Sequence, residues 1–351
     1  MSSIIDTKTK ANNFLERASK ATIEDCLRLT EDDKLVIVTD NKAYRVADEL
    51  AKAASEKTKD ISSYIVEDYG TRPLKHLPEE IAAAMGHATA SIFVAAGLQE
   101  ELGDFRYPFL DLIRRYKIRH AHMPDMNVEN MRRMLTKPEE IKEYSARLYS
   151  KLEGYEHLRI ETTKGTNLTT ERGSGFRWHI SYGIIRPGEW ENLPSGEIFT
   201  CPVRVSGEVV VDGTLGQGFD IKYGILKTPL RFKIENSRVK QGSVECECEN
   251  KELEQEFVNY IFNIDEESSK VAELAFGTNP GVRRLIGRLL IDEKCIGTSH
   301  IALGNPPDPE KIGGGAWWQS KGHIDCVIKK INLYVDDKQV LKDGKLLDDN
   351  I

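Results

Sequence analysis

The chain has 351 residues, of which 40% are hydrophobic and 30% are charged, and its formal net charge is −7. This length suits two domains with separate cores. The acidic balance argues against nucleic acid as the main partner, because phosphate binding needs a basic surface, and the absence of an apolar run of 18 residues argues against a membrane span.

The first 125 residues alternate between short apolar runs and helical patterns. Lys34–Asp40 is an apolar run that ends in an acidic turn, and in the segment that follows Val46, Leu50 and Ala53 fall on one helical stripe. Strands that alternate with helices predict βαβ units and a parallel sheet. Because neither a G-x-G-x-x-G segment nor a P-loop is present, a nucleotide-binding role is unsupported.

A helical stretch is predicted over Asn127–Glu156, with an interruption near Pro138 and Asn127 as the helix cap. We expect this stretch to lead from one domain to the next. The predicted domains are residues 1–150, an N-terminal α/β domain, and residues 151–351, a C-terminal metal-binding catalytic domain.

Beyond Leu158 the pattern changes to strand-like segments separated by glycine and asparagine turns. Such spacing predicts antiparallel strands, and Asp343-Gly344 predicts a hairpin near the C-terminus. The predicted fold class is therefore α/β plus α+β, with a parallel N-terminal α/β domain and a mostly antiparallel C-terminal β domain that carries the metal site.

The cysteines and the N-terminus predict a cytoplasmic protein. The six cysteines occur singly or in one C-x-C pair, which does not suggest a disulfide framework, and the N-terminus lacks the features of a signal peptide. Cys246 and Cys248 could bind a metal, but their alternation with glutamates favours the buried face of a strand.

Six acidic and imidazole side chains in the second domain stand beside glycines or apolar strand residues: Glu197, Glu273, Glu293, His300, His323 and Asp325. His323 and Asp325 are two residues apart in a predicted strand, so both point to one face while Ile324 and Cys326 point to the other. Burying several carboxylates together requires a compensating cation. A mixed histidine and carboxylate set suits Zn, Co, Mn or Fe.

Each of these residues also has an ordinary interpretation. Glu197 follows a Pro-Ser-Gly turn and could be solvated, and Glu293 could belong to an exposed Asp-Glu-Lys turn. Single histidines are often satisfied core or surface residues. His179, in the segment RWHISYG, is either a candidate for supporting the site or contacting substrate, or a structural strand histidine.

Four ordered segments between about Thr162 and Ile331 resemble the thermophilic metallo-aminopeptidases of the aminopeptidase T and aminopeptidase S type. These segments are NLPSGEIFTCP, AELAFGTNPG, DEKCIGTSHIALG and HIDCVI. The resemblance implies a hydrolase with two divalent metal ions (Zn, Co or Mn) and a homodimeric assembly.

The resemblance also implies roles for the six residues. Glu197 would bridge both ions, and Glu273, Glu293 and His300 would hold one ion or its surroundings. His323 and Asp325 would hold the other ion. Glu197 and Glu273 are the residues expected to take part in catalysis as well.

The implied activity is that of a metallo-aminopeptidase acting on a peptide or a small-molecule substrate, with no nucleic acid or membrane partner. A metal-bound hydroxide would attack the scissile carbonyl, and the ions would stabilise the developing oxyanion. The acidic cluster would attract a free N-terminal amine, so that amino acids leave one at a time.

Some residues depart from the aminopeptidase pattern. Those enzymes place a tyrosine about seven residues after the position of His300, where Pro307 stands in this chain, and the Gly313-Gly314-Gly315 run with Trp317 and Trp318 is also unlike them. These features are closer to relatives that include an iron-dependent dioxygenase acting on dihydroxypyridine rings.

The alternative function is therefore a non-heme iron dioxygenase, or another metalloenzyme, acting on a small aromatic or heterocyclic acid. A carboxylate at Glu273, where that dioxygenase has a histidine, favours the peptidase. A non-catalytic scaffold is the third hypothesis.

Overall fold

The structure is a computed structural model that describes residues 13–246, 250–314 and 318–348. The chain forms two compact units. The first runs to Glu139 and includes Gly183–Ser195, and the second comprises Glu140–Tyr182 and the chain from Gly196 onward. None of the helices in the described residues combines the length and the apolar character that crossing a bilayer requires.

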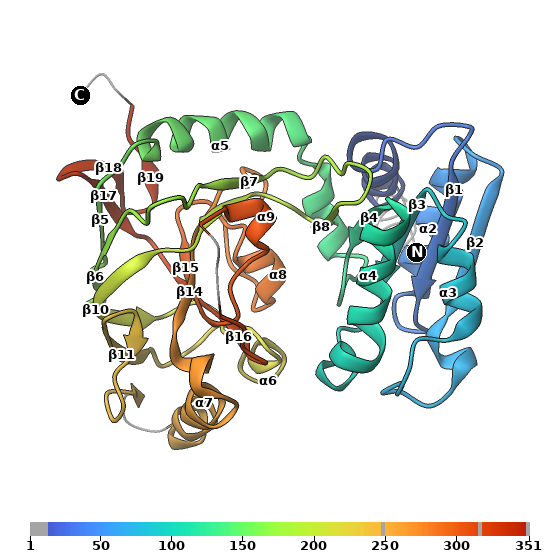
Figure 1. The fold of residues 1–351 in the computed structure, drawn as a ribbon. Helices are drawn as coiled ribbons and strands as arrows, with labels where there is room; N and C mark the ends of the chain where they lie inside the picture. The colour runs from blue at the N-terminus through green and yellow to red at the C-terminus, as the bar shows by residue number, and fades with distance from the viewer. Residues whose placement is uncertain (1–12, 247–249, 315–317, 349–351) are drawn as a thin grey trace, which may run out of the picture. The chain divides into compact units, whose positions relative to one another are not determined.

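The first unit is built on a five-stranded parallel sheet, as predicted (Figure 1). In sheet order the strands are β2 (Asp60–Ile65), β1 (Lys34–Thr39), β3 (Ala90–Val94), β4 (Arg119–His122) and β8 (Trp190–Asn192). Its helices are α2 (Tyr44–Ser55), α3 (Glu79–Met85) and α4 (Tyr107–Tyr116), preceded by a helix over residues 13–21.

Alternating side chains of β1 enter two different cores. Leu35 and Ile37 belong to one apolar cluster, while Val36 and Val38 belong to another. A strand that is apolar on both faces is typical of a parallel sheet covered on both sides. This is why β1 is a continuous apolar run without polar alternation.

Residues 183–195, which the sequence analysis assigns to the second domain, lie in the first unit. They contribute β8, which pairs in parallel with β4. A strand of three residues has too few positions to show a periodic pattern, so local sequence carries no signal for this return of the chain. The independent folding of residues 1–150 and 151–351 stays a prediction.

An ion-pair network is buried just beyond the carboxyl ends of β1 and β3. Arg72 Nη1 lies 2.9 Å from Asp40 Oδ2, and Arg72 Nη2 lies 2.5 Å from Glu101 Oε2. The carboxylate side chains are 1% and 0% exposed, and they also accept the backbone N–H groups of Ala43 and Leu74. Both buried carboxylates therefore have hydrogen-bonded partners within the protein.

The second unit contains two antiparallel sheets, again as predicted. The larger has the order β12 (Arg238–Val239), β11 (Leu230–Glu235), β10 (Val203–Val211), β6 (Asn167–Glu171), β5 (His157–Glu161), β17 (Asn332–Val335), β18 (Lys338–Lys342) and β19 (Lys345–Leu346), with β13 (Glu245–Cys246) paired to β11. The smaller has the order β16 (His323–Ile328), β15 (Ser299–Gly304), β14 (Val271–Gly277), β9 (Glu197–Thr200) and β7 (His179–Ser181). The helices are α5 (Pro138–Leu152), α6 (Phe219–Tyr223), α7 (Lys251–Asn263), α8 (Leu289–Asp292) and α9 (Pro309–Ile312).

Several local predictions for this part of the chain are confirmed. Helix α5 begins at Pro138, where the interruption is predicted. In the first unit the Asn127 side chain accepts the N–H of Asn130 at 2.8 Å, but the cap residue of the short helix that begins at Asn130 is Glu129 and not the predicted Asn127. Strands β18 and β19 form the hairpin predicted at Asp343-Gly344. Cys246 is buried, whereas the predictions for Cys248, Gly315 and Trp317 fall outside the described residues.

Candidate metal centre

The smaller sheet of the second unit has two chemically different faces. One face packs into the main core of this unit, to which it contributes Ile198, Leu274, Phe276, Ile301, Leu303, Ile324, Cys326 and Ile328. Because strand side chains alternate, the residues between these positions point the other way. Ile324 and Cys326 thus occupy the core face, as the sequence predicts.

The opposite face brings β14, β15 and β16 together at one row. Asp325 on β16 lies opposite Ala302 on β15, and Ala302 lies opposite Glu273 on β14. His323, two residues before Asp325, lies opposite Gly304. Ala302, which has a small side chain, therefore stands between the two carboxylates in this row.

A second row on the same face adds His300 and Glu197. His300 lies opposite Ala275, and Glu197 lies opposite Gly277. A β-carbon at Gly277 would lie 2.0 Å from the carbonyl oxygen of Cys295. Glycine is therefore required there, because the backbone just after Glu293 crosses directly over β14.

The segment that carries Glu293 is fixed by a buried aspartate. Asp292 accepts hydrogen bonds from the N–H groups of Ile286 and Gly287 at 2.7 and 2.8 Å, and from Thr214 Oγ1 at 2.6 Å. The next two residues, Glu293 and Lys294, consequently project from a rigid turn. The side chain of Glu293 is 6% exposed, so the interpretation of this residue as part of an exposed turn is wrong.

Glu197, Glu293 and His300 form the first group of candidate metal ligands, with ligand atoms within 4.8 Å of one another. Lys294 lies among them. Its Nζ is 2.5 Å from Glu197 Oε1 and 2.6 Å from Glu293 Oε1, and its side chain is 1% exposed. A buried ammonium group is therefore already paired with both glutamates of this group.

Glu273, His323 and Asp325 form the second group, also within 4.8 Å. His323 Nε2 lies 3.3 Å from Asp325 Oδ1 and 4.0 Å from Glu273 Oε2. The His323 side chain is 31% exposed, which makes it the most accessible member of the group. His323 Nδ1 lies 2.7 Å from the carbonyl oxygen of Asn305, so Nδ1–H donates to that oxygen and Nε2 faces the carboxylates.

His300 lies between the two groups. Its Nε2 is 3.5 Å from Glu197 Oε2 and 3.6 Å from Glu273 Oε1. His300 Nδ1 is buried without a hydrogen-bond partner among the described residues. The tautomer of His300 is therefore determined by the groups that face Nε2, which are Glu197 and Glu273.

The carboxylates dominate the electrostatics of both histidines. Burial alone would lower the pKa of His300, but the hydrogen bond with Glu273 and the charge of Glu197 outweigh it and raise the pKa to about 9. For His323 burial also opposes, yet the charge of Asp325 and its hydrogen bond raise the pKa to about 10. Both histidines are therefore held in the protonated form by these carboxylates unless another cation is bound.

The pKa values of the carboxyl groups are shifted in opposite directions. Burial raises the pKa of Glu293 to about 7, against the lowering effect of Lys294, and burial likewise raises the pKa of Glu273. Burial would also raise the pKa of Asp325, but the neighbouring charge of His323 lowers it to about 2. Asp325 is therefore the carboxylate of the cluster that most firmly keeps its charge.

The donor set fits a divalent metal ion. Within the described residues, four carboxylates and two imidazoles gather at this face with the single ammonium group of Lys294. Ligands about 2.0–2.2 Å from a tetrahedral zinc ion stand about 3.4 Å apart. The separations of 3.3 and 4.0 Å around His323 Nε2 are close to that value, and histidine with carboxylate is a set that Zn, Mn or Fe accepts.

The structure brings together all six residues that the sequence singles out, although in different subsets. Glu273 stands with His323 and Asp325, and Glu293 and His300 stand with Glu197. Their roles as metal ligands, and the catalytic roles of Glu197 and Glu273, stay predictions.

Sequence reasoning missed Lys294, because a lysine after Asp-Glu looks like part of a solvated turn. The apolar residues on both sides of it, in LLIDEKCIG, were the available signal.

Two further residues lie near this face. His179 on β7 is opposite Phe199, and the two rings are 5.0 Å apart; its role stays a prediction. Trp318 packs against a small apolar cluster that includes Phe199 and Ala275, and its Nε1–H donates to Gly304 O at 2.9 Å. An apolar wall therefore adjoins the polar cluster on the same side of the sheet.

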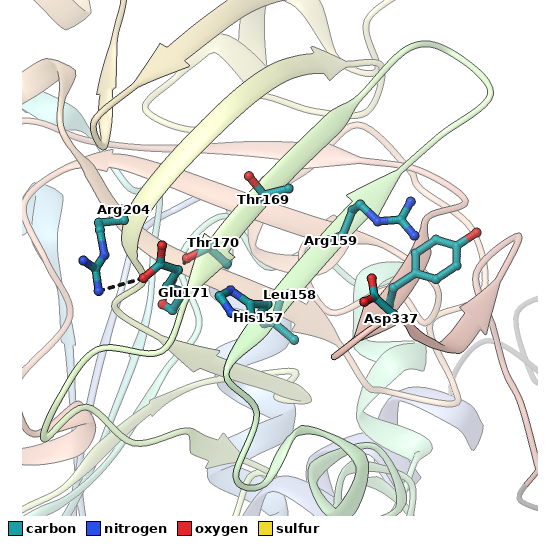
Figure 2. Close-up of a pocket in the computed structure, with 9 residues that line it drawn as sticks. His157, Leu158, Arg159, Thr169, Thr170, Glu171, Arg204 and Asp337 are labelled. Atoms are coloured by element: carbon teal, nitrogen blue, oxygen red, sulfur yellow. Dashed lines mark hydrogen bonds and ion pairs between the residues drawn. The ribbon is translucent and has the colours of Figure 1, made fainter.

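A hollow elsewhere in the second unit contains none of the six predicted residues. This cavity of about 230 Å³ is lined by His157, Leu158, Arg159, Thr169, Thr170, Glu171, Arg204, Tyr334 and Asp337. Figure 2 shows the lining side chains. Two of its charged side chains form an ion pair, with Arg204 Nη2 2.7 Å from Glu171 Oε2.

Comparisons with known proteins agree with this geometry. The family model described as thermophilic metalloprotease (M29) matches residues 134–337, which include both candidate ligand groups. A search of curated proteins gives no match.

Two solved structures share the fold over nearly the whole chain. 2,5-Dihydroxypyridine dioxygenase from Pseudomonas putida KT2440 aligns with a TM-score of 0.70 at 17% identity, covering 96% of this chain and 97% of its own. AmpT from Thermus thermophilus aligns with a TM-score of 0.69 at 18% identity, covering 96% of this chain and 100% of its own. Because both identities are low, these alignments establish the fold and leave the reaction open.

Proposed function

Since the chain belongs to the thermophilic metalloprotease (M29) family, we propose that it is a metal-dependent aminopeptidase that releases N-terminal amino acids from peptides. The observation that carries this proposal is the cluster of buried carboxylates and imidazoles on one face of the smaller sheet. Such a cluster needs a cation for stability, and a metal ion with an open position is a hydrolytic catalyst.

When bound, a Zn²⁺, Co²⁺ or Mn²⁺ ion lowers the pKa of a water molecule and polarises the scissile carbonyl. The side chains of Glu273, His323 and Asp325 would hold that ion, and the hydrogen bond with the Asn305 carbonyl would keep His323 Nε2 directed at it. The geometry requires no movement of these strands, because all three side chains already share one face.

Glu197 is the proposed general base. Lys294 holds its Oε1, so that Oε2 points toward His300 and the second ligand group. From that position the carboxylate takes a proton from the attacking water and passes it to the leaving amine. The contact with the buried ammonium orients Glu197 for this task.

The cluster also accounts for selection of a free N-terminus. With four carboxylates against one lysine in the described residues, the site retains negative charge even when one divalent ion is bound. A protonated α-amine is attracted to such a site, whereas a blocked terminus is not. The apolar wall formed with Phe199 and Trp318 is suited to contact the first side chain of the substrate.

The number of ions is part of the proposal. The resemblance to the aminopeptidases implies two, with Glu197 between them. Lys294 contacts Glu197 and Glu293, two of the side chains that would surround the second ion.

A second candidate is a mononuclear iron dioxygenase that acts on a small heterocyclic acid. Two histidines and one carboxylate are a common set for such an iron, and His300, His323 and Asp325 supply them. Pro307, where the aminopeptidases have a tyrosine, also favours this candidate. Against it stands Glu273, a further carboxylate that lies 3.6 Å from His300 Nε2 and suits a hydrolytic ion.

The test uses purified protein stripped with a chelator and then supplied separately with Zn²⁺, Co²⁺, Mn²⁺ or Fe²⁺. We expect hydrolysis of chromogenic amino-acid amides with Zn²⁺, Co²⁺ or Mn²⁺, and none for the same amides after N-acetylation. Oxygen uptake with hydroxylated pyridines and Fe²⁺, without amide hydrolysis, would establish the second candidate and overturn the first.

A homodimeric assembly and a cytoplasmic location are also parts of the proposal, and both come from the sequence analysis. Light scattering coupled to size exclusion measures the first directly. A mass of 39.7 kDa, that of one chain, would contradict the dimer.

A further inference from the structure

The Lys294 side chain is the one ammonium group that the described residues place inside the cluster. It is 1% exposed and lies 2.5 Å from Glu197 Oε1 and 2.6 Å from Glu293 Oε1. Lysine is almost never fully buried unless it is paired. The two glutamates are therefore its partners in the folded protein, and Lys294 is a permanent part of their surroundings.

The backbone around Lys294 fixes it in this place. Its carbonyl oxygen accepts the N–H of Asn279 at 3.0 Å, and its own N–H donates to Ile291 O at 3.1 Å. Asp292, two residues earlier, is buried and accepts three hydrogen bonds within 2.8 Å. The backbone from which the ammonium group extends is therefore held on both sides.

A metal ion in the first ligand group would have to share its ligands with this ammonium. An ion needs carboxylate oxygens at about 2.0–2.2 Å, and the Oε1 atoms of Glu197 and Glu293 are already hydrogen-bonded to Lys294 Nζ. A divalent ion and an ammonium group held against the same two carboxylates also repel each other strongly at low dielectric. The lysine meets the charge requirement that a metal ion would otherwise meet.

The second ligand group has no such internal cation. In the described residues the ion pairs of Glu273 and Asp325 are all with histidines. A neutral imidazole is a metal ligand, whereas a lysine ammonium has no lone pair to offer. A divalent ion in the second group would therefore not compete with an ammonium group for its carboxylate ligands.

We propose that Lys294 takes the place of a second metal ion, so that the chain binds a single divalent ion, between Glu273, His323 and Asp325. This inference rests on the proposed metal-dependent function, but it is independent of which reaction the ion promotes. Glu197 is then a base held by a lysine and does not bridge two ions.

The experiment is a count of bound ions. Metal-free wild type and the Lys294→Met variant are dialysed to equilibrium against excess Zn²⁺, and zinc per chain is measured by atomic emission. We expect one ion in the wild type and two in Lys294→Met, because methionine removes the charge and frees both glutamates at similar side-chain volume. Two ions in the wild type, or one in the folded variant, would overturn the proposal.

Three further variants serve as a backup and as controls for this count of bound ions. Lys294→Gln is the second variant, for the case that Lys294→Met does not give a cooperative melting transition, and the same increase to two ions is expected. Lys321→Met, at an exposed lysine, is the matched control and should bind one ion. In Glu293→Gln we expect one ion with affinity within about threefold of the wild type, whereas a two-ion site would lose an ion.

The count of bound zinc tests the role of Lys294 separately from the proposed aminopeptidase activity. An absence of amide hydrolysis with one bound Zn²⁺ per chain would reject the aminopeptidase and keep the role of Lys294. Amide hydrolysis with two bound Zn²⁺ per wild-type chain would keep the aminopeptidase and reject the role of Lys294.

Discussion

Each unit of this protein buries carboxylates, but the two units balance them differently. In the first unit Asp40 and Glu101 are buried against the guanidinium of Arg72 and against backbone N–H groups. In the second unit the carboxylates at the smaller sheet outnumber the one lysine that the described residues bring to them. The first network is complete as folded, and the second is complete only with an added cation.

The same contrast recurs inside the candidate metal centre. Glu197 and Glu293 are paired with Lys294, as Asp40 and Glu101 are paired with Arg72. The other group has histidines alone as partners. A group of possible ligands therefore indicates a metal site only where no lysine or arginine of the protein is already paired with its carboxylates.

The largest effect should come from the side chain that binds the proposed ion without an internal partner. Asp325→Asn removes a charged ligand, so metal affinity should fall by more than the roughly 10–100-fold that loss of an outer hydrogen-bond partner costs, and hydrolysis should reach background. Equilibrium dialysis with Zn²⁺ and the amide assay measure both. Asp337→Asn, at an exposed carboxylate, is the matched control. If both variants had the same zinc affinity and the same rate of hydrolysis, the proposed difference between the two networks would be wrong.

The next largest effect should appear in the first unit and in stability alone. Arg72→Met leaves Asp40 and Glu101 buried without their cation, which should lower the free energy of unfolding by about 3–5 kcal/mol. Urea denaturation measures this change. Zinc content of the folded variant should equal that of the wild type, and a parallel loss of zinc would show that the two networks are not independent.

A smaller effect is expected at Glu197. Glu197→Gln retains the shape of the side chain and leaves Lys294 paired with Glu293, so folding should change little. Hydrolysis should fall by about 100-fold or more, as for loss of a general base, while zinc content stays at one ion per chain. An active variant would remove Glu197 from the catalytic assignment, and loss of zinc would show that it is a ligand.

The smallest effect concerns pH and the metal-free protein. Burial raises the pKa of Glu293 from its usual 4.5 to about 7, so the folded state binds a proton that the unfolded state has lost. This contribution to stability is full below pH 4.5 and is lost as the pH rises through 7. Melting in chelator should therefore show the wild type losing stability relative to Glu293→Gln between about pH 4.5 and 7. An opposite or flat difference would contradict this environment for Glu293.

The two histidines also make the metal-free protein less stable as the pH rises, but over a higher pH range. The carboxylates raise the pKa of His300 to about 9 and that of His323 to about 10, against the effect of burial. Their contribution to the stability of the metal-free protein is full below the usual value of 6.5 and is lost as the pH rises through 9 and 10. Bound Zn²⁺ replaces these protons, so the loaded protein should lose less stability over this range.

Local pattern was sufficient for much of this fold. Continuous apolar runs such as Val36–Val38 predicted a covered parallel sheet, and alternation predicted that His323 and Asp325 share a face opposite Ile324 and Cys326. These features depend on side-chain periods of two and on burial, both of which are visible in a short window of sequence. Strand β8, with three residues, is too short to show such a pattern.

Long-range register was not predictable in the same way. Glu273 stands with His323 and Asp325 because β14, β15 and β16 align in one particular register, with an irregularity between Val271 and Glu273. A shift of one residue would turn Glu273 into the core. Lys294 was missed for a related reason, since its burial depends on the backbone of its segment crossing at Gly277.

The most direct test of the account is anomalous diffraction at the zinc edge from crystals of the Zn²⁺-loaded wild type. The account predicts one peak in the cluster, about 2.0–2.2 Å from ligand atoms of Glu273, His323 and Asp325, with Lys294 still between Glu197 and Glu293. A peak between those two glutamates, or no peak at the sheet face, would contradict it.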